Sequence, residues 1–164
     1  MSGLLTGHQA EHLNLNTEYS MQDDRSNSGR VAGIDFGTVR IGIAITDVER
    51  KIASPYENYS RRDQAADEKY FQELVKQEEI VLLVVGLPVH MSGDESQKSR
   101  EARQFGDWLS ASTGLPVEYV DERYTTRHAE QLLHRAQLTA KQRRRRRDML
   151  AAQMILTTFI ESNR

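Results

Sequence analysis

The sequence predicts one α/β domain on a mixed five-stranded sheet, with three antiparallel strands, then parallel strands, and helices on both faces. Two β-branched runs, 31–35 and 41–45, flank a Gly-containing turn, and a third run follows at 52–59. Such a series is typical of an antiparallel meander. From residue 63 onward, helical periodicity alternates with short apolar runs. That alternation predicts helices packed on both faces of a sheet whose later strands are parallel.

Each element follows from a local pattern. Pro55 indicates that the third strand lies at a sheet edge, because proline cannot donate to a ladder. Ile80–Val85 is six apolar residues long, which predicts a central strand buried on both faces. The remaining strand is expected at 116–120, and the helices at 63–79, from Ser96 to near Gly114, from Thr125 through Leu133, and from about Arg144 to Ser162.

The first 29 of the 164 residues differ in character from the rest. They lack a sustained apolar pattern and carry one basic and four acidic residues, whereas the remainder carries 21 basic and 20 acidic residues. A segment of this kind cannot bury enough surface to offset its chain entropy. We therefore expect a disordered tail at 1–29 and a folded domain at 30–164. Neither a signal peptide nor a membrane-spanning run is recognisable.

The chain contains no cysteine, which excludes disulfides, thiolate nucleophiles and thiolate zinc sites. This composition fits a reducing cytosol, so a cytoplasmic location is expected. The five histidines do not pair at the spacing of a zinc motif. Any metal is therefore expected to be a hard cation held by carboxylate oxygens.

Three acids occupy positions where a strand ends or a helix packs on the sheet. Asp35 closes the first strand and Glu122 follows the fifth, and ligand sites in open α/β sheets gather at such strand ends. Asp148 lies in the last helix, on one face with Ala151, Ala152, Ile155 and Phe159. An acid on a sheet-facing helix side is costly unless it is paired or coordinated.

Each acid also has an ordinary structural interpretation. Asp148 is equally consistent with a helix-start acid favoured by the macrodipole, or with a partner for a preceding arginine. Asp35 is equally consistent with a turn acid, and Glu122 alone with a surface loop residue. The three positions together favour a shared site.

Four stretches of the chain carry a family resemblance. They are GIDFGTVRIG at 33–42, VGLPVHMSG at 85–93, VDERYTT at 120–126 and RDMLAA at 147–152. In order and spacing they resemble the YqgF (RuvX-like) family, which belongs to the RNase H-like nucleases alongside the RuvC Holliday junction resolvases. The resemblance spans about residues 30–162.

The resemblance implies an RNase H-like fold in which Asp35, Glu122 and Asp148 form a catalytic carboxylate cluster that binds Mg²⁺ or Mn²⁺, as two ions. Asp35 matches the first-strand acid of the family, Glu122 the acid of its Asp-Glu-Arg motif, and Asp148 the acid before its Ala-Ala pair. Asp121 remains an alternative ligand. The chain departs from the family in having Tyr124 where leucine is frequent, and in its dense run of arginines.

Further residues near the acids are candidates for binding substrate. Gly37 lets a phosphate approach closely or simply makes the turn, and Arg123 contacts either a phosphate or a neighbouring acid. The basic run just before Asp148 is expected to bind phosphates nonspecifically, although a solvated helix start is its ordinary explanation. The full set of expected substrate-binding residues is Gly37, Thr38, Arg40, Arg123, Arg143, Arg144 and Arg147.

The function that follows is metal-dependent hydrolysis of phosphodiester bonds, and the resemblance points to processing of the 5′ end of pre-16S ribosomal RNA. Resolution of Holliday junctions and a non-catalytic, nucleic-acid-binding assembly role are the alternatives. An actin-like phosphotransferase has a similar Asp-x-Gly-Thr loop but needs two such domains around ATP. The expected partner is structured RNA or branched DNA, without a membrane, and the chain is expected to be a monomer or homodimer.

Overall fold

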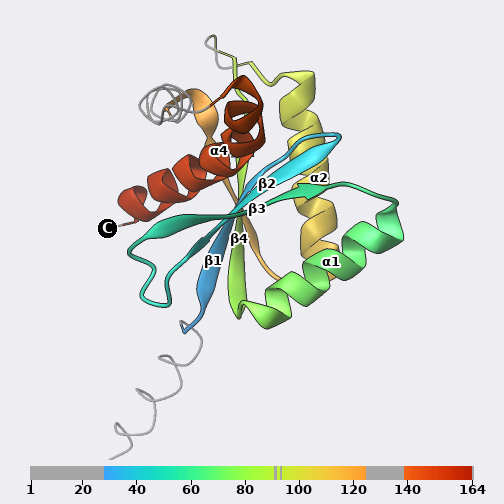
Figure 1. Ribbon diagram of the computed structural model, residues 1–164, viewed down its shortest axis with the longest axis vertical. Helices are drawn as coiled ribbons and strands as arrows, with labels where there is room; N and C mark the ends of the chain where they lie inside the picture. Colours follow the sequence, from blue (N-terminus) through green and yellow to red (C-terminus); the bar gives the residue numbers. More distant parts are fainter. Residues whose placement is uncertain (1–27, 91, 93, 125–138, 164) are drawn as a thin grey trace, which may run out of the picture.

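The computed structural model describes residues 28–90, 92, 94–124 and 139–163 (Figure 1). The tail expected at 1–29 lies almost wholly outside these residues and stays a prediction. The helix expected from Thr125 through Leu133 also lies outside them. Among the described helices, none is long and apolar enough to cross a membrane.

Five strands form one mixed sheet, as the sequence predicted. They are β1 (Arg30–Asp35), β2 (Arg40–Thr46), β3 (Ala53–Ser60), β4 (Ile80–Leu87) and β5 (Val117–Asp121), in the order β3-β2-β1-β4-β5. The first three pair antiparallel, whereas β4 pairs parallel with both β1 and β5. Strand β3 lies at the edge and contains Pro55, as expected. Strands β1 and β4 are neighbours inside the sheet. Because they run parallel, their carboxyl ends lie at the same edge of the sheet.

Helices cover both faces of the sheet (Figure 1). α1 (Gln64–Gln77) and α2 (Gln97–Thr113) pack on one face, and α4 (Ala140–Ser162) packs on the other. A short 3-10 turn, η1 (Glu122–Tyr124), follows β5. The predicted limits of α2 are confirmed, because Ser96 caps its start and Gly114 ends it in the left-handed conformation, with φ 73°. Only glycine adopts that conformation without steric cost.

Helix α4 begins earlier than the predicted start near Arg144. Thr139 accepts a hydrogen bond from the backbone of Gln142, whose side chain accepts one from the Thr139 backbone in return. This capping box satisfies two backbone donors that would otherwise lack partners. The arginine run therefore lies within the first turns of the helix, and the helix begins about one turn earlier than predicted.

The sheet-facing side of α4 differs slightly from the predicted one. Ala152 and Ile155 are fully buried, as expected, but Ala151 and Phe159 are only partly buried. Leu156 and Ile160 complete the buried side instead. Asp148 lies one helical turn before Ala152 and so remains at the margin of the buried side.

Three glycines on adjacent strands let the α4 backbone and the Glu122 side chain pack closely against the sheet. A Cβ at Gly42 of β2 would overlap the backbone carbonyl of Asp148, and one at Gly33 of β1 would lie 2.8 Å from the Ala152 carbonyl oxygen. A Cβ at Gly86 of β4 would overlap the Glu122 carboxylate. We name Gly33, Gly42 and Gly86 the glycine seat of the site.

Replacing Gly42 by alanine should destabilise the fold. The added methyl group forces α4 away from β2, and overpacking of this kind costs about 1–3 kcal/mol. Urea unfolding should therefore show a lower midpoint with an unchanged slope. The control is Ser54→Ala, on the exposed side of the neighbouring strand β3, which should stay within about 0.5 kcal/mol of the wild type. Equal stability of Gly42→Ala and the control would contradict the close approach.

Candidate active site

Asp35 lies at the carboxyl end of β1, directly opposite Gly42 of β2. Side chains alternate along a strand, so Asp35 shares the α4 side of the sheet with Val31, which packs in the core beneath α4. Burial raises the pKa of Asp35 well above its ordinary value, and the negative charges of Glu122 and Asp148 raise it further. The fold therefore brings the charges of all three predicted acids within interaction range.

Glu122 and its neighbour Asp121 have different surroundings. The Glu122 carboxylate lies over Gly86, beside Ile155 of α4. Burial and the charge of Asp121 raise the pKa of Glu122, while Lys98 opposes them. Asp121 instead accepts hydrogen bonds from the backbone and side chain of Arg123, at 2.9 and 2.7 Å. The geometry favours Glu122 over Asp121 as the member of the cluster.

Asp148 is held by two side chains from the antiparallel strands. Asn58 Nδ2 donates to its Oδ2 at 3.3 Å, and Arg40 Nε lies 3.6 Å from the same oxygen. Asn58 stands on β3 and Arg40 begins β2, so the contacts fix the first turns of α4 across the sheet. Asp148 keeps 28% of its side chain exposed, which leaves the carboxylate open to a ligand.

The three acids approach one another without a complete coordination shell. Among the described residues, no three His, Cys, Asp or Glu side chains are arranged to hold a metal ion. The donor set is nevertheless suited to a hard cation, since it consists of carboxylate oxygens. Repulsion of the Asp35 carboxylate by Glu122 and Asp148 is also the condition that a bound cation relieves.

The turn after β1 carries three of the predicted substrate-binding residues. A Cβ at Gly37 would overlap the backbone carbonyl of Arg40, so this glycine is required by the turn itself. Thr38 is exposed and lines a surface pocket. Arg40 begins β2 beside Asp148, and 44% of its side chain is exposed to solvent.

The remaining predicted basic residues separate into two groups. Arg123 donates a hydrogen bond to Asp121. Of the two partners that the sequence left open for Arg123, a phosphate or a neighbouring acid, the structure shows the acid. Arg143 and Arg147 line a pocket of about 530 Å³ with Lys141 and Ala140 at the start of α4. The side chain of Arg144 lies outside the described part of the structure.

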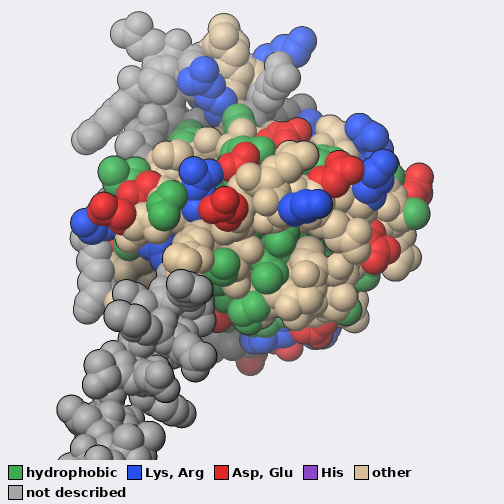
Figure 2. All heavy atoms as spheres, turned by 90° about the horizontal axis from the view of Figure 1, so that it is seen from below, with side chains coloured by type: hydrophobic (Ala, Val, Ile, Leu, Met, Phe, Trp, Pro, Cys, Tyr) green, Lys and Arg blue, Asp and Glu red, His purple; other side chains and the backbone are tan. Residues whose placement is uncertain are grey.

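Charge is not distributed as one basic field. On the face seen in Figure 2, acidic and basic side chains are interspersed among apolar and other groups. Long-range attraction of a polyanion is therefore modest over this face.

Two residues near the acids were not predicted from the sequence. Asn58 lies in β3, whose sequence is typical of an edge strand, and Lys98 lies in the first turn of the amphipathic helix α2. No short pattern marks either position, because their partners Asp148 and Glu122 are distant in the chain. Only strand pairing and helix packing reveal them.

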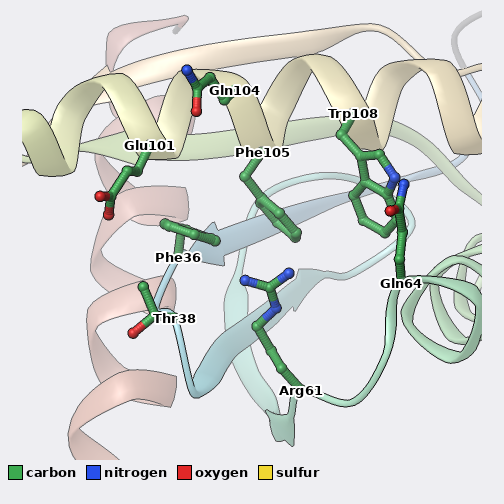
Figure 3. Close-up of a pocket in the computed structure, with 8 residues that line it drawn as sticks. All are labelled: Phe36, Thr38, Arg61, Gln64, Glu101, Gln104, Phe105 and Trp108. Carbon is green, nitrogen blue, oxygen red and sulfur yellow. The ribbon is translucent and has the colours of Figure 1, made fainter.

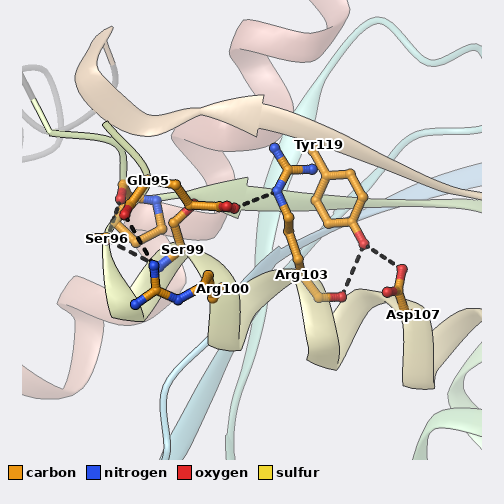
Figure 4. A network of polar contacts seen from close by, with 8 residues as sticks. Glu95, Ser96, Ser99, Arg100, Arg103, Asp107 and Tyr119 are labelled. Atoms are coloured by element: carbon orange, nitrogen blue, oxygen red, sulfur yellow. Dashed lines mark hydrogen bonds and ion pairs between the residues drawn. The ribbon is translucent and has the colours of Figure 1, made fainter. Parts of the chain in front are cut away.

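A polar network surrounds the start of α2 (Figure 4). Lys98 is the second residue of this helix. Arg103 Nε lies 2.7 Å from Glu95 Oε1, and the Arg103 guanidinium stacks over the Tyr119 ring of β5 at 5.1 Å. The Tyr119 hydroxyl contacts Asp107 at 3.1 Å. The network joins α2 to β5, and so sets Lys98 relative to Glu122.

A comparison with protein families identifies the chain. The model described as RuvX, Holliday junction resolvase, matches residues 29–162. The chain belongs to the RuvX family. This confirms the resemblance inferred from the four sequence stretches.

Curated relatives of the RuvX chain carry the name "Putative pre-16S rRNA nuclease". One from Rhodopirellula baltica is 43% identical over 148 residues, covering 90% of this chain and 86% of the relative. Another, from Koribacter versatilis, is 35% identical, covering 86% and 92%. The family description and the relatives' names both denote nucleases, as the sequence predicted.

Solved structures share the fold. Thermus thermophilus RuvC in complex with a Holliday junction substrate has a TM-score of 0.51 at 16% identity, covering 82% of this chain and 95% of RuvC. Fowlpox virus resolvase in complex with Holliday junction DNA has a TM-score of 0.53 at 8% identity, covering 82% and 98%. The predicted RNase H-like fold is confirmed.

Asp67 of α1 is a buried carboxylate on the face of the sheet opposite α4. Asp67 accepts hydrogen bonds from Tyr59 Oη (2.8 Å), Arg61 Nε (3.1 Å) and Arg62 N (2.9 Å). Arg61 in turn lies over the Phe36 ring at 5.5 Å. Burial acts to raise the pKa of Asp67, but the hydrogen bonds outweigh it and lower the pKa. Asp67 thus holds Arg61 against Phe36, the residue after Asp35.

Replacing Asp67 by asparagine should destabilise the protein by about 2–3 kcal/mol at neutral pH, because a charged acceptor of several hydrogen bonds is lost. A folded-state pKa below the unfolded value contributes stability above the unfolded pKa and loses it as pH falls through the folded pKa. The difference between wild type and Asp67→Asn should therefore be constant above about pH 5 and shrink below about pH 4.

Urea unfolding at a series of pH values measures this difference. Glu73→Gln is the control, since Glu73 is an exposed acid on the same helix whose contact to Lys69 is 3.9 Å long. Its effect should stay within about 0.5 kcal/mol. A gap between wild type and Asp67→Asn that widens on acidification would contradict the assignment.

Proposed function

We propose that this chain hydrolyses phosphodiester bonds in nucleic acid at a divalent-metal site formed by Asp35, Glu122 and Asp148. The observation that carries the proposal is the placement of these acids at one edge of the sheet: Asp35 lies opposite Gly42, against which the Asp148 backbone packs, and Glu122 lies over Gly86 of the neighbouring strand β4. In keeping with this placement, Glu122 and Asp148 both raise the pKa of Asp35. Structural carboxylates are normally paired with cations or donors, so a cluster of mutually repelling acids at a strand end is typical of a functional site.

The three carboxylates would hold Mg²⁺ or Mn²⁺, and two ions fit the number of oxygens offered. The chemistry that such ions supply when bound is activation of a water molecule and neutralisation of charge at the phosphate. No protein nucleophile is required. Repulsion within the cluster favours cation binding because it is relieved when positive charge enters.

Other side chains would position the substrate. Arg40 Nε lies 3.6 Å from Asp148 Oδ2, and the positive charge of Lys98 acts on Glu122, where it lowers the pKa of that carboxyl. Arg40 and Lys98 are both exposed and are able to contact a phosphate oxygen on either side of the cleaved bond. The pocket lined by Arg143 and Arg147 would hold the backbone further along the strand.

The substrate that best fits the relatives is precursor 16S ribosomal RNA, cleaved to give its 5′ end. The name borne by relatives at 43% and 35% identity supports this choice. The family description favours a second candidate, the Holliday junction. We place the activity in the cytoplasm, carried out by a monomer or a homodimer, of which the homodimer suits symmetric cutting of a junction.

The proposal is tested by incubating the purified protein and Mn²⁺ with labelled precursor RNA and, separately, with a labelled four-way junction. Cleavage of the RNA at the mature 5′ end supports the first substrate, and paired symmetric cuts in the junction support the second. Cleavage of neither would refute both versions.

Asp148→Asn should abolish this cleavage while preserving or strengthening nucleic-acid binding, because the carboxylate charge is removed and the shape is kept. Asn also leaves the helix face and its neighbours in place. The measurements are single-turnover cleavage and binding by fluorescence anisotropy. Unchanged cleavage by Asp148→Asn would refute the site assignment, and loss of both properties together would indicate a structural defect instead.

Adding Mn²⁺ or Mg²⁺ to the metal-free protein should stabilise it, since the folded state alone assembles the acids. At ten times the dissociation constant the gain is about 1.4 kcal/mol, which a thermal shift detects. Asp35→Asn should lose this gain, whereas the control Glu118→Gln, an exposed acid on β5, should keep it. An equal shift for all three proteins would show that the cation binds elsewhere.

A further inference from the structure

A second concave site lies on the opposite side of the sheet from α4, at the same strand end as Asp35. It is a pocket of about 390 Å³ between α2, the start of α1 and the turn after β1 (Figure 3). Its volume falls within the range of about 300–1,000 Å³ that is usual for ligand pockets. Its lining residues are Phe36, Thr38, Arg61, Gln64, Glu101, Gln104, Phe105 and Trp108.

The lining is unusual because it combines aromatic faces with a cation. The Arg61 guanidinium lies 5.5 Å from the centre of the Phe36 ring and 5.4 Å from that of Phe105. Those two rings stack at 4.7 Å, and Trp108 lies 5.4 Å from Phe105. Figure 3 shows Arg61 and Phe36 directed toward the aromatic side chains of α2. Flat, weakly hydrated groups of this kind are suited to stacking a planar ring.

The pocket is also lined by groups that pair with the edge of a planar heterocycle. The Gln64 and Gln104 amides each offer donors and an acceptor, and Glu101 offers acceptors alone. Both glutamines are exposed, so their side chains are available to a ligand that enters from solvent.

The position of the pocket relates it to the acid cluster. Asp35 and Phe36 are consecutive and point to opposite faces of the sheet, and Thr38 of the same turn lines the pocket. Glu101 lines both this pocket and a neighbouring one of about 620 Å³ that also includes Lys98. A chain that crosses the strand end at Asp35 therefore meets both Lys98 and the aromatic pocket along α2.

We propose that this pocket receives one unstacked nucleobase of a single-stranded segment of the substrate, adjacent to the bond that is cleaved. The inference rests on the proposed function, and it specifies how that site holds its substrate. Trp108 and Arg61 supply the stacking surface, the buried Phe105 supports them from below, and the glutamine amides contact the base edge. The substrate strand is therefore unpaired next to the scissile bond.

The chain carries its own reporter for this pocket, because Trp108 is its single tryptophan. Stacking of a base against the indole quenches its fluorescence. The probe is a five-nucleotide single-stranded RNA added to the full-length protein in EDTA, so that binding is read without cleavage. The comparison probe is a five-residue abasic phosphodiester of equal charge, which keeps the phosphates and lacks the bases.

The expected result is saturable quenching by the RNA and none by the abasic chain. Gln64→Ala combined with Gln104→Ala should weaken the quenching affinity about tenfold, as the loss of two hydrogen bonds predicts. Gln77→Ala is the control, since Gln77 is exposed at the far end of α1. Circular dichroism verifies that each variant is folded.

Equal quenching by both probes would overturn the proposal, because the pocket would then bind backbone. Absence of quenching by the RNA would overturn it as well. Since the readout needs neither metal nor turnover, the two proposals fail separately: cleavage without quenching refutes the base pocket alone, and quenching without cleavage refutes the nuclease proposal alone.

Discussion

The close approach of α4 to the sheet is the constraint on which the site depends. In the glycine seat, Gly33 and Gly42 let the α4 backbone pack directly against β1 and β2 at two positions, and Gly86 of β4 leaves room for the side chains of Glu122 and Ile155. With any larger residue at Gly42, the Asp148 backbone would have to retreat from the strand end. The same seat accommodates the Glu122 carboxylate over Gly86. Small residues thus determine where charged residues meet, although they carry no chemistry themselves.

The fold concentrates negative charge on one side of the sheet and aromatic surface on the other. Asp35 and Phe36 divide the end of β1 between these environments. The acid faces α4, Asp148 and Glu122, whereas the ring faces Phe105 and Arg61. Asp67 stabilises the second side by holding Arg61 in place. The acid cluster and the aromatic pocket are therefore built from adjacent residues of a single strand end.

Local patterns predicted most of the architecture. The meander, the buried parallel strand, Pro55 at the edge, and the limits of α2 at Ser96 and Gly114 all follow from neighbours in the sequence. The prediction for the start of α4 was about one turn late, because the helix is capped by the Thr139–Gln142 capping box, which precedes the basic run. The prediction for its buried side was also shifted by one residue: Leu156 and Ile160 are buried where Ala151 and Phe159 were expected. Helical periodicity alone defines the buried side of a helix only to within about one residue.

The sequence by itself determined the fold class, the family and the three acids as candidates, because strand ends, periodicity and motif spacing are local properties. Only the tertiary structure decided which side chains each acid contacts. It turned Asp121 toward Arg123 and Glu122 toward Gly86, brought Asn58 and Arg40 to Asp148, and placed Lys98 near Glu122. These partners are separated along the chain by tens of residues in most cases, so no local signal links them, and strand pairing and helix packing alone set their contacts.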